Sequence, residues 1–393
     1  MTIRFETIAA RGGRDVPSTS RPLTPPIYHS NVYAFEAMED VEAVWDGQEP
    51  GFIYGRYGSP NTAMLESLVA DLEGGEAGVA CASGMGAHTA LFLSLLAPGD
   101  HLVAARDLYG TTSTFLREEL SRSGVETTFV DATNPSQVLA ALGPRTRAVY
   151  VEAVSNPLLK LVNVEALGGE LRSRGVELIV DSSFTSPAIV KPLGLGATVV
   201  VHSATKFLSG HGDVTAGIVV GRRELMDRVR VAMIRIGTNL GPFDAWLACR
   251  GLRTLHVRLE RQSANALSLA RFLEGRSEVS RVYYPGLLSH PQASLAQRLF
   301  KNGAGAICAF DLRGGAPAVE RFMRGLRLIE FAPSFGDVAT TWSYPARTSH
   351  RRIPEAELAA LGIGPGLVRL SVGIESVEDL IEDLTGALER TGQ

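Results

Sequence analysis

The middle of the chain alternates short apolar runs with helical patterns, and this alternation limits the fold more than any other feature of the sequence. Apolar, β-branched runs predict strands at residues 78–82, 101–105, 125–130, 147–154, 176–181, 197–202 and 217–220. Between them, apolar residues at helical spacing predict helices at residues 63–73, 87–96, 112–123, 135–142 and 164–174. Strand–helix–strand units connect through right-handed crossovers, so the sequence predicts an α/β fold with a mainly parallel sheet covered by helices.

Polar residues stand directly after or at the end of three predicted strands: Ser83 and Gly84, Asp181, and Ser203–Lys206. Ligands of such sheets gather at the carboxyl ends of the strands, so we expect these residues to share one site. A serine and small residues at a strand-to-helix turn expose backbone N–H groups to a phosphate. Asp181 fits two interpretations, a cap for the next turn or a buried carboxylate that keeps a heterocyclic nitrogen protonated.

Lys206 is the candidate for covalent chemistry. The 38 basic residues include only four lysines, so arginine is the usual cation of this chain. A desolvated lysine amine can lose its proton and condense with a carbonyl, whereas a guanidinium cannot. A lysine that merely caps a strand is the structural alternative. A serine acyl-enzyme would also match Ser203 and Lys206, but it needs Ser-Asp-Asn and Lys-Thr-Gly motifs, which the sequence lacks.

Composition limits the class of protein. A length of 393 residues predicts two or three domains, and 45% hydrophobic residues with a net charge of −4 argue against a nucleic-acid binder. The three cysteines, Cys81, Cys249 and Cys308, have no spacing typical of zinc sites or disulfides. We therefore expect a cytoplasmic protein. Without a signal-peptide pattern or a long apolar run, we expect neither secretion nor a membrane span.

The two ends of the chain suggest further parts of the site. Residues 1–60 are rich in proline, glycine and aromatic residues, which predicts an arm that packs on another subunit. Tyr54 and Arg56 flank a glycine there and could offer a phenol and a guanidinium to one ligand. Near the other end, Arg369 stands in an apolar strand predicted at 367–372 within a smaller α/β domain. A buried arginine is costly unless it meets an anion, so we expect it to bind a carboxylate.

Taken in order, these motifs resemble the Cys/Met-metabolism family of pyridoxal-phosphate enzymes, which includes cystathionine γ-synthase, cystathionine γ-lyase, methionine γ-lyase and the O-acylhomoserine sulfhydrylases. The resemblance covers essentially the whole chain and rests on Tyr54–Arg56, Leu72–Glu76, Ser83–Met85, Asp107–Gly110, Ser155–Pro157, Val180–Asp181, His202–Asp213 and Leu367–Glu375. It implies fold type I with a seven-stranded, mainly parallel sheet. It divides the chain into an arm at 1–60, a large cofactor-binding domain at 61–255 and a C-terminal domain at 256–393.

The resemblance also implies a role for each motif residue. Lys206 would bind pyridoxal 5′-phosphate covalently and move protons, and Asp181 would pair with the ring nitrogen. Tyr109 would stack on the ring and act as acid or base near the leaving group. The phosphate would be held by Ser83, Gly84, Met85, Ser203 and Thr205, with Tyr54 and Arg56 from a neighbouring subunit. The substrate would contact Arg369, Asn156, Ser334 and Thr111.

The reaction implied is γ-elimination or γ-replacement on a sulfur-containing or O-acyl-homoserine amino acid, in a homotetramer of two catalytic dimers. Thr111 stands where the family usually has glycine, or cysteine in methionine γ-lyases, while the loop Ser334–Asp337 resembles the methionine γ-lyase and sulfhydrylase branch. Trp342 matches no family position that we can identify. A β-lyase, an O-acetylhomoserine sulfhydrylase and a non-catalytic regulator that binds the cofactor remain alternatives.

Overall fold

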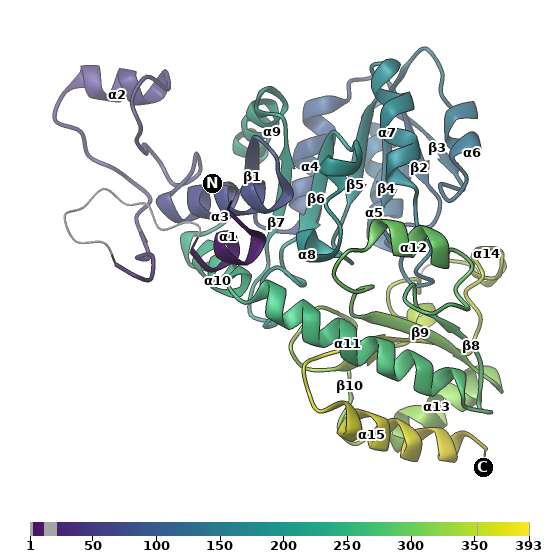
Figure 1. The fold of residues 1–393 in the computed structure, drawn as a ribbon. Coiled ribbons are helices and arrows are strands. Elements are labelled where there is room, and N and C mark those ends of the chain that lie inside the picture. Colours follow the sequence, from purple (N-terminus) through teal and green to yellow (C-terminus); the bar gives the residue numbers. More distant parts are fainter. Residues whose placement is uncertain (1–2, 12–21, 352, 393) are drawn as a thin grey trace.

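The computed structural model describes residues 3–11, 22–351 and 353–392 (Figure 1). Its larger sheet has seven strands in the order β1-β7-β6-β5-β4-β2-β3. The strands are β1 (Ala77–Cys81), β2 (His101–Ala105), β3 (Glu126–Val130), β4 (Thr146–Glu152), β5 (Glu177–Asp181), β6 (Val199–Ser203) and β7 (Gly217–Gly221). Only β7 runs antiparallel to its neighbours among these strands. The predicted α/β fold with a seven-stranded, mainly parallel sheet is confirmed.

Both faces of this sheet are buried, as expected for strands that read as continuous apolar runs. The first core cluster joins the sheet to residues of helices α4, α7 and α9, and the second joins it to residues of α3, α8 and α10. The helices of this part are α3 (Pro60–Glu73), α4 (Gly84–Leu95), α5 (Gly110–Phe115), α6 (Pro135–Ala140), α7 (Val164–Ser173), α8 (Ser186–Ile189), α9 (Arg223–Ile236) and α10 (Pro242–Leu252), and a π-helical turn spans Leu116–Leu120.

The smaller sheet has the order β10-β11-β12-β9-β8 and a core of its own. Its strands are β8 (Val279–Tyr283), β9 (Ile307–Leu312), β10 (Glu330–Phe331), β11 (Thr341–Ser343) and β12 (Leu367–Ser371), and its core includes residues of helices α13 (Gly315–Gly325) and α15 (Val377–Glu389). Helices α12 (Ala293–Leu299) and α14 (Glu355–Leu361) instead contribute Ala296 and Leu358 to the second core cluster. The long helix α11 (Leu255–Glu274) runs from the larger part along this sheet (Figure 1). Trp342 is a core residue here, with its ring centroid 4.8 Å from that of Phe331 and 5.9 Å from that of Phe322.

The N-terminal segment contains two short helices with different surroundings. In α1 (Phe5–Arg11), Ala9 is fully buried and packs in the core cluster that includes α3. In α2 (Met38–Trp45) no residue is buried, and Figure 1 shows this helix far from the rest of the chain. Residues 12–21 of the predicted arm lie outside the described residues. No helix in the described ranges is long and apolar enough to cross a membrane.

Several elements differ from the sequence prediction. The helix expected at 87–96 begins at Gly84, because the Ser83 hydroxyl accepts a hydrogen bond from the Gly86 N–H at 2.9 Å and caps the first turn. Helices α10 and α11 are separate, with the break at Arg253 and Thr254, two residues after Gly251. Strands β8, β10 and β11 were not predicted. Two of them, β10 and β11, have only two and three residues and are too short for a recognisable alternation.

Candidate active site

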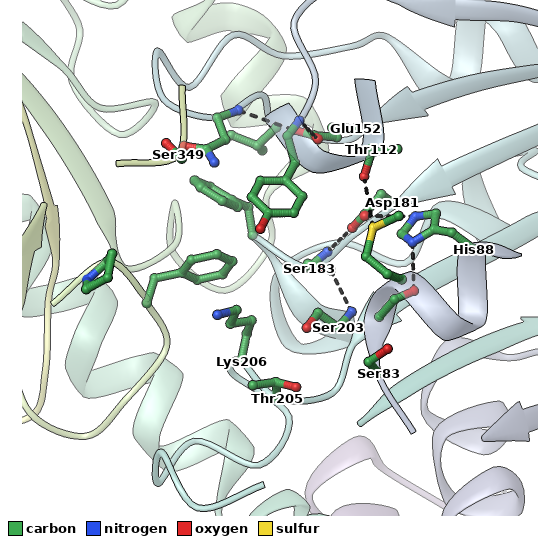
Figure 2. Close-up of a pocket in the computed structure, with 18 of the residues that line it drawn as sticks. Ser83, His88, Thr112, Glu152, Asp181, Ser183, Ser203, Thr205, Lys206 and Ser349 are labelled. Carbon is green, nitrogen blue, oxygen red and sulfur yellow. Dashed lines mark hydrogen bonds and ion pairs between the residues drawn. The ribbon is translucent and has the colours of Figure 1, made fainter. Parts of the chain in front are cut away.

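A pocket lies at the carboxyl ends of β4, β5 and β6, facing the β12 side of the smaller sheet (Figure 2). Its lining comprises Ser83, Gly84, Met85, His88, Tyr109, Thr112, Glu152, Val154, Asn156, Asp181, Ser183, Phe184, Ser203, Thr205, Lys206, Pro333, Phe335, Thr348, Ser349 and Arg369. The structure therefore brings together the residues after the predicted strands and the predicted arginine of the C-terminal part.

Lys206 follows β6 by three residues and projects its amine into the pocket. Its Nζ donates a hydrogen bond to the Ser334 hydroxyl at 2.8 Å. Burial, together with the positive charge of Arg369, lowers the pKa of Lys206 to about 8. A lysine with this pKa has an appreciable neutral fraction near neutral pH and can act as a nucleophile or base.

Asp181 is the last residue of β5 and lies at one end of the pocket (Figure 2). Its Oδ1 accepts a hydrogen bond from the Ser183 N–H at 2.8 Å, and its Oδ2 lies 3.3 Å from His88 Nε2. Burial alone would raise the pKa of this carboxyl, but the hydrogen bond and charge of His88 and the bonds from Ser183 outweigh it and hold the pKa below its ordinary value. Asp181 is therefore a buried anion, able to hold a proton on a pyridine-type nitrogen.

The other end of the pocket is built for a phosphate. Helix α4 starts at Gly84, so the N–H groups of its first turn point at this end, together with the positive end of the helix dipole. A Cβ added to Gly84 would lie 3.1 Å from the Cβ of Ser203, so the small residue allows the helix start to approach β6. The hydroxyls of Ser83, Ser203 and Thr205 line the same end. This donor set fits the phosphate of pyridoxal phosphate, as Lys206 and Asp181 fit its aldehyde and ring nitrogen.

Glu152 lines the pocket and fixes the backbone of two other lining residues. Its carboxylate oxygens accept hydrogen bonds from the backbone N–H of Tyr109 at 2.6 Å and of Asn156 at 3.2 Å. Burial, and then the charge of Asp181, raises the pKa of Glu152 well above its ordinary range. The side chain thus fixes the backbone at two predicted site residues.

Arg369 lies on β12 and is almost completely buried. Its Nη1 donates to the Asn156 side-chain oxygen at 2.9 Å, and its Nη2 donates to the Ser334 carbonyl at 2.9 Å. The Nε of Arg369 is buried and has no hydrogen-bond partner among the described residues. Burial lowers the pKa of Arg369 to about 10, so the group stays cationic at neutral pH. A buried cation with a free donor is well suited to a carboxylate ligand.

Four predicted residues, Tyr54, Arg56, Thr111 and Ser334, are not among the residues that line the pocket, although the Ser334 hydroxyl accepts a hydrogen bond from Lys206 Nζ. Tyr54 and Arg56 do not reach it in this chain, and Arg56 donates to the Ile234 carbonyl at 2.9 Å instead. Thr111 is exposed, while the next residue, Thr112, is buried in the lining and directs its hydroxyl to the sulfur of Met85. Thr111 and Thr112 are consecutive residues of α5, which begins at Gly110, so their side chains point in different directions around the helix. Only Thr112 points into the pocket.

Several pocket residues were not identified from the sequence. They are His88, Thr112, Glu152, Val154, Ser183, Phe184, Pro333, Phe335, Thr348 and Ser349. Glu152 is the last residue of β4, as Asp181 is of β5, but the strand predicted at 147–154 placed Glu152 inside the strand and hid this signal. Ser349 reaches the pocket from a loop, where its hydroxyl lies 2.8 Å from His350 Nδ1, and no pattern in the sequence indicates this.

Comparison with known proteins adds independent evidence. Residues 6–389 match the family model for "Cys/Met metabolism PLP-dependent enzyme". The chain is similar to an L-methionine gamma-lyase of Porphyromonas gingivalis, with 42% identity over 388 residues covering 98% of this chain and 97% of the relative. It is also similar to an O-succinylhomoserine sulfhydrylase of Pseudomonas aeruginosa, with 40% identity over 98% of this chain and 95% of the relative. The crystal structure of a cystathionine gamma synthase from Xanthomonas oryzae pv. oryzae in complex with cystathionine superposes with a TM-score of 0.94 at 37% identity, covering 100% of this chain and 99% of that chain.

Proposed function

The chain belongs to the Cys/Met-metabolism family of pyridoxal-phosphate-dependent enzymes, and from this premise we propose that it cleaves the Cγ–S bond of a methionine-like amino acid. Its reaction class is γ-elimination or γ-replacement on amino acids, and its cofactor is pyridoxal phosphate. The choice of a thioether substrate within that class is the proposal.

One observation carries this choice: the wall around Lys206 and Arg369 is apolar. The centroid of the Phe335 ring lies 4.9 Å from Lys206 Nζ and 5.4 Å from the Arg369 guanidinium carbon, and the tilted ring of Phe184 packs against it with the centroids 4.5 Å apart. Apart from Lys206 and Arg369, His88 is the only pocket residue among those described with a side chain that can be cationic, and it faces Asp181. A thioether fits such a wall, whereas the second carboxylate of O-succinylhomoserine would lack a free partner.

We assign the cofactor contacts from the two ends of the pocket. Asp181 would hold the ring nitrogen, and Lys206 would hold the aldehyde carbon. Ser83, Gly84, Met85, Ser203 and Thr205 would hold the phosphate, and Tyr109 would cover the ring. When bound, pyridoxal phosphate supplies an electron sink for the α-carbon of the amino acid.

Side chains of this protein would bind the substrate and transfer the protons. Arg369, with Asn156 and Ser334, would hold the substrate carboxylate and so fix the α-carbon near Lys206. The neutral amine of Lys206 would take the α-proton and then a β-proton, because loss of a γ-substituent requires a free electron pair on Cβ. The phenol of Tyr109, in the same pocket, would donate a proton to the departing sulfur.

We propose a homotetramer of two catalytic dimers in the cytoplasm. Tyr54 and Arg56 lie outside the pocket of their own chain, and α2 exposes Met38 and Trp45 at 67% and 60% of their surface. Apolar surface of this kind on an extended segment favours burial against another subunit. The cysteines support a reducing compartment, since all three are free and buried.

Parallel incubations would test the substrate choice. The purified enzyme would receive methionine, cystathionine, O-acetylhomoserine or O-succinylhomoserine, each with and without an added thiol. We expect methionine alone to yield α-ketobutyrate and methanethiol at the highest kcat/KM. Consumption of an O-acylhomoserine only when thiol is present, with methionine inert, would instead assign a sulfhydrylase. Pyruvate from cystathionine would assign a β-lyase.

A further inference from the structure

His88 occupies a position behind the cofactor pocket that the proposed chemistry has not used. It lies on α4, one turn after Gly84, and only 3% of its surface is exposed. Its Nδ1 is 2.8 Å from the Gly84 carbonyl oxygen, and its Nε2 is 2.8 Å from the Tyr150 hydroxyl and 3.3 Å from Asp181 Oδ2 (Figure 2). One imidazole therefore contacts both the helix start at the phosphate end and the carboxylate at the ring-nitrogen end.

The partners of His88 determine where its protons are. A carbonyl oxygen only accepts hydrogen bonds, so Nδ1 must carry a proton to bond Gly84. The second nitrogen, Nε2, is nearest to the Tyr150 hydroxyl, which donates its own proton to Asp181 Oδ2 at 3.4 Å and so accepts from Nε2. Nε2 also faces Asp181 Oδ2 at 3.3 Å, which only accepts when it is ionised. A lone pair on Nε2 would point at that anion, whereas a proton on Nε2 would form a charge-assisted hydrogen bond with it.

The groups around His88 favour a proton on Nε2. The ionisable groups that contact it are Tyr150 from β4 and Asp181 from β5, and Glu152 lies beside Asp181 on the neighbouring strand. Burial keeps Tyr150 a neutral phenol, with its pKa raised well above the ordinary value, and raises the pKa of Glu152 as well. Asp181 is then the one anion of this cluster, and an isolated buried carboxylate is costly without a paired cation.

We propose that His88 is a positioning residue whose Nε2–H faces Asp181 and keeps this carboxylate ionised and aimed at the ring nitrogen of the cofactor. The inference rests on the proposed role of Asp181. Tyr150 contributes a second contact, because its hydroxyl lies 3.4 Å from Asp181 Oδ2 as well as within hydrogen-bond distance of His88. Through Gly84 the same imidazole also fixes the first turn of the phosphate-binding helix.

A structural role alone would have a different signature. The His88 ring stacks near Phe92 with centroids 6.2 Å apart and meets Tyr150 edge-on at 5.5 Å, so its loss must reduce packing in any case. Lost packing would lower the melting temperature without altering the protonation of the bound cofactor. Protonation of the ring nitrogen is therefore the readout that separates the two roles.

The experiment uses the holoenzyme reconstituted with pyridoxal phosphate labelled at the ring nitrogen for NMR. The chemical shift of this nitrogen is followed between about pH 6 and pH 9 in the wild type, His88→Leu and His88→Gln, and cofactor affinity is measured by equilibrium dialysis. Thr89→Val is the matched control, because Thr89 also bonds a carbonyl of the first turn of α4, that of Met85 at 2.9 Å, but does not line the pocket.

We expect the wild type and Thr89→Val to keep the ring nitrogen protonated across the range. His88→Leu should lose that proton within it and bind the cofactor about tenfold to hundredfold more weakly, since a charge-assisted hydrogen bond is removed. His88→Gln, which can still donate one neutral hydrogen bond, should lie between them and serves as the test if the leucine variant does not fold.

The inference is overturned if His88→Leu and His88→Gln keep the protonated signal over the whole range, whatever their thermal stability. Asp181→Asn distinguishes this failure from that of the proposed site. If Asp181→Asn removes the ring proton while the His88 variants retain it, only the role of His88 is wrong. If Asp181→Asn also retains the proton, the assignment of Asp181 itself fails.

Discussion

The cofactor-binding part of the pocket, which we call the inner end, and the part that would bind the substrate carboxylate, which we call the outer end, differ in how the chain builds them. The inner end takes Ser83, Asp181 and Ser203 from the ends of strands in one sheet, so the hydrogen bonds of that sheet fix their relative positions. The outer end combines Asn156 with Arg369, which stands 213 residues further along the chain in the other sheet. The inner end therefore depends mainly on sheet topology, while the outer end also depends on how two separate cores dock.

The largest effect should come from the inner end, at Lys206. Lys206→Ala should lower kcat about a thousandfold or more, because both covalent attachment and proton transfer are lost. In the wild type, borohydride reduction followed by peptide mapping should place the pyridoxyl group on this residue. Lys160, which is paired with Asp107 at 2.6 Å, and Lys191 act as internal controls. A pyridoxyl group on either of them would overturn the assignment of the inner end.

At the outer end, Arg369→Lys should raise KM about a hundredfold with a smaller change in kcat. Lysine keeps the charge but cannot bond Asn156, the Ser334 carbonyl and a carboxylate together. Steady-state kinetics with methionine would measure this. The matched control is Arg347→Lys, an exposed arginine 3.8 Å from Glu320, which should change KM less than about twofold. An unchanged KM for Arg369→Lys would mean that the carboxylate binds elsewhere.

A second subunit is expected to complete the pocket through Arg56. Arg56→Ala alone should lower activity about tenfold to hundredfold, through the loss of a charged phosphate contact. Mixed with Lys206→Ala under subunit exchange, it should recover roughly a quarter of wild-type activity, since half of the dimers are hybrids with one intact site. Mass spectrometry of the mixture verifies the exchange. Proven exchange without recovered activity would contradict a shared site and confine the pocket to one chain.

The smallest effect concerns pH, and it distinguishes the environment of Lys206 from that of an ordinary lysine. Because the pKa of Lys206 is lowered to about 8, the neutral, nucleophilic amine increases as pH rises through that value. Cofactor capture by the cofactor-free protein, followed by absorbance, should therefore accelerate about tenfold between about pH 7 and pH 9 and then level off. A rate that keeps rising above about pH 10 would show an unperturbed lysine and an open, solvated pocket.

The same contrast explains what the sequence could predict. Asp181 and Lys206 were found because both follow apolar runs, and parallel strands place their carboxyl ends together. His88 could not be found in this way, because its contact with Asp181 depends on how α4 lies across β4 and β5. A histidine inside a helical pattern carries no sign of its partner.

At the outer end, small differences in helical phase or in packing decide the outcome. Thr111 was expected to face the substrate, but α5 begins at Gly110 and places Thr112 in the pocket instead. Trp342 had no interpretation from the sequence, and it fills the core of the smaller sheet between Phe322 and Phe331. The first outcome depends on where α5 starts, and the second depends on tertiary packing. Local sequence patterns determine neither with enough precision.

Hydrogen exchange at the β-carbon of methionine is the most direct test of the proposed Cγ–S cleavage. The enzyme would act on methionine in deuterium oxide, and the methionine recovered at partial conversion would be analysed by NMR. Removal of a β-proton by Lys206 before the thiol leaves predicts deuterium at both Cα and Cβ, with α-ketobutyrate as the product. Deuterium at Cα alone, together with pyruvate from cystathionine, would show that no β-proton is removed and that the enzyme is a β-lyase.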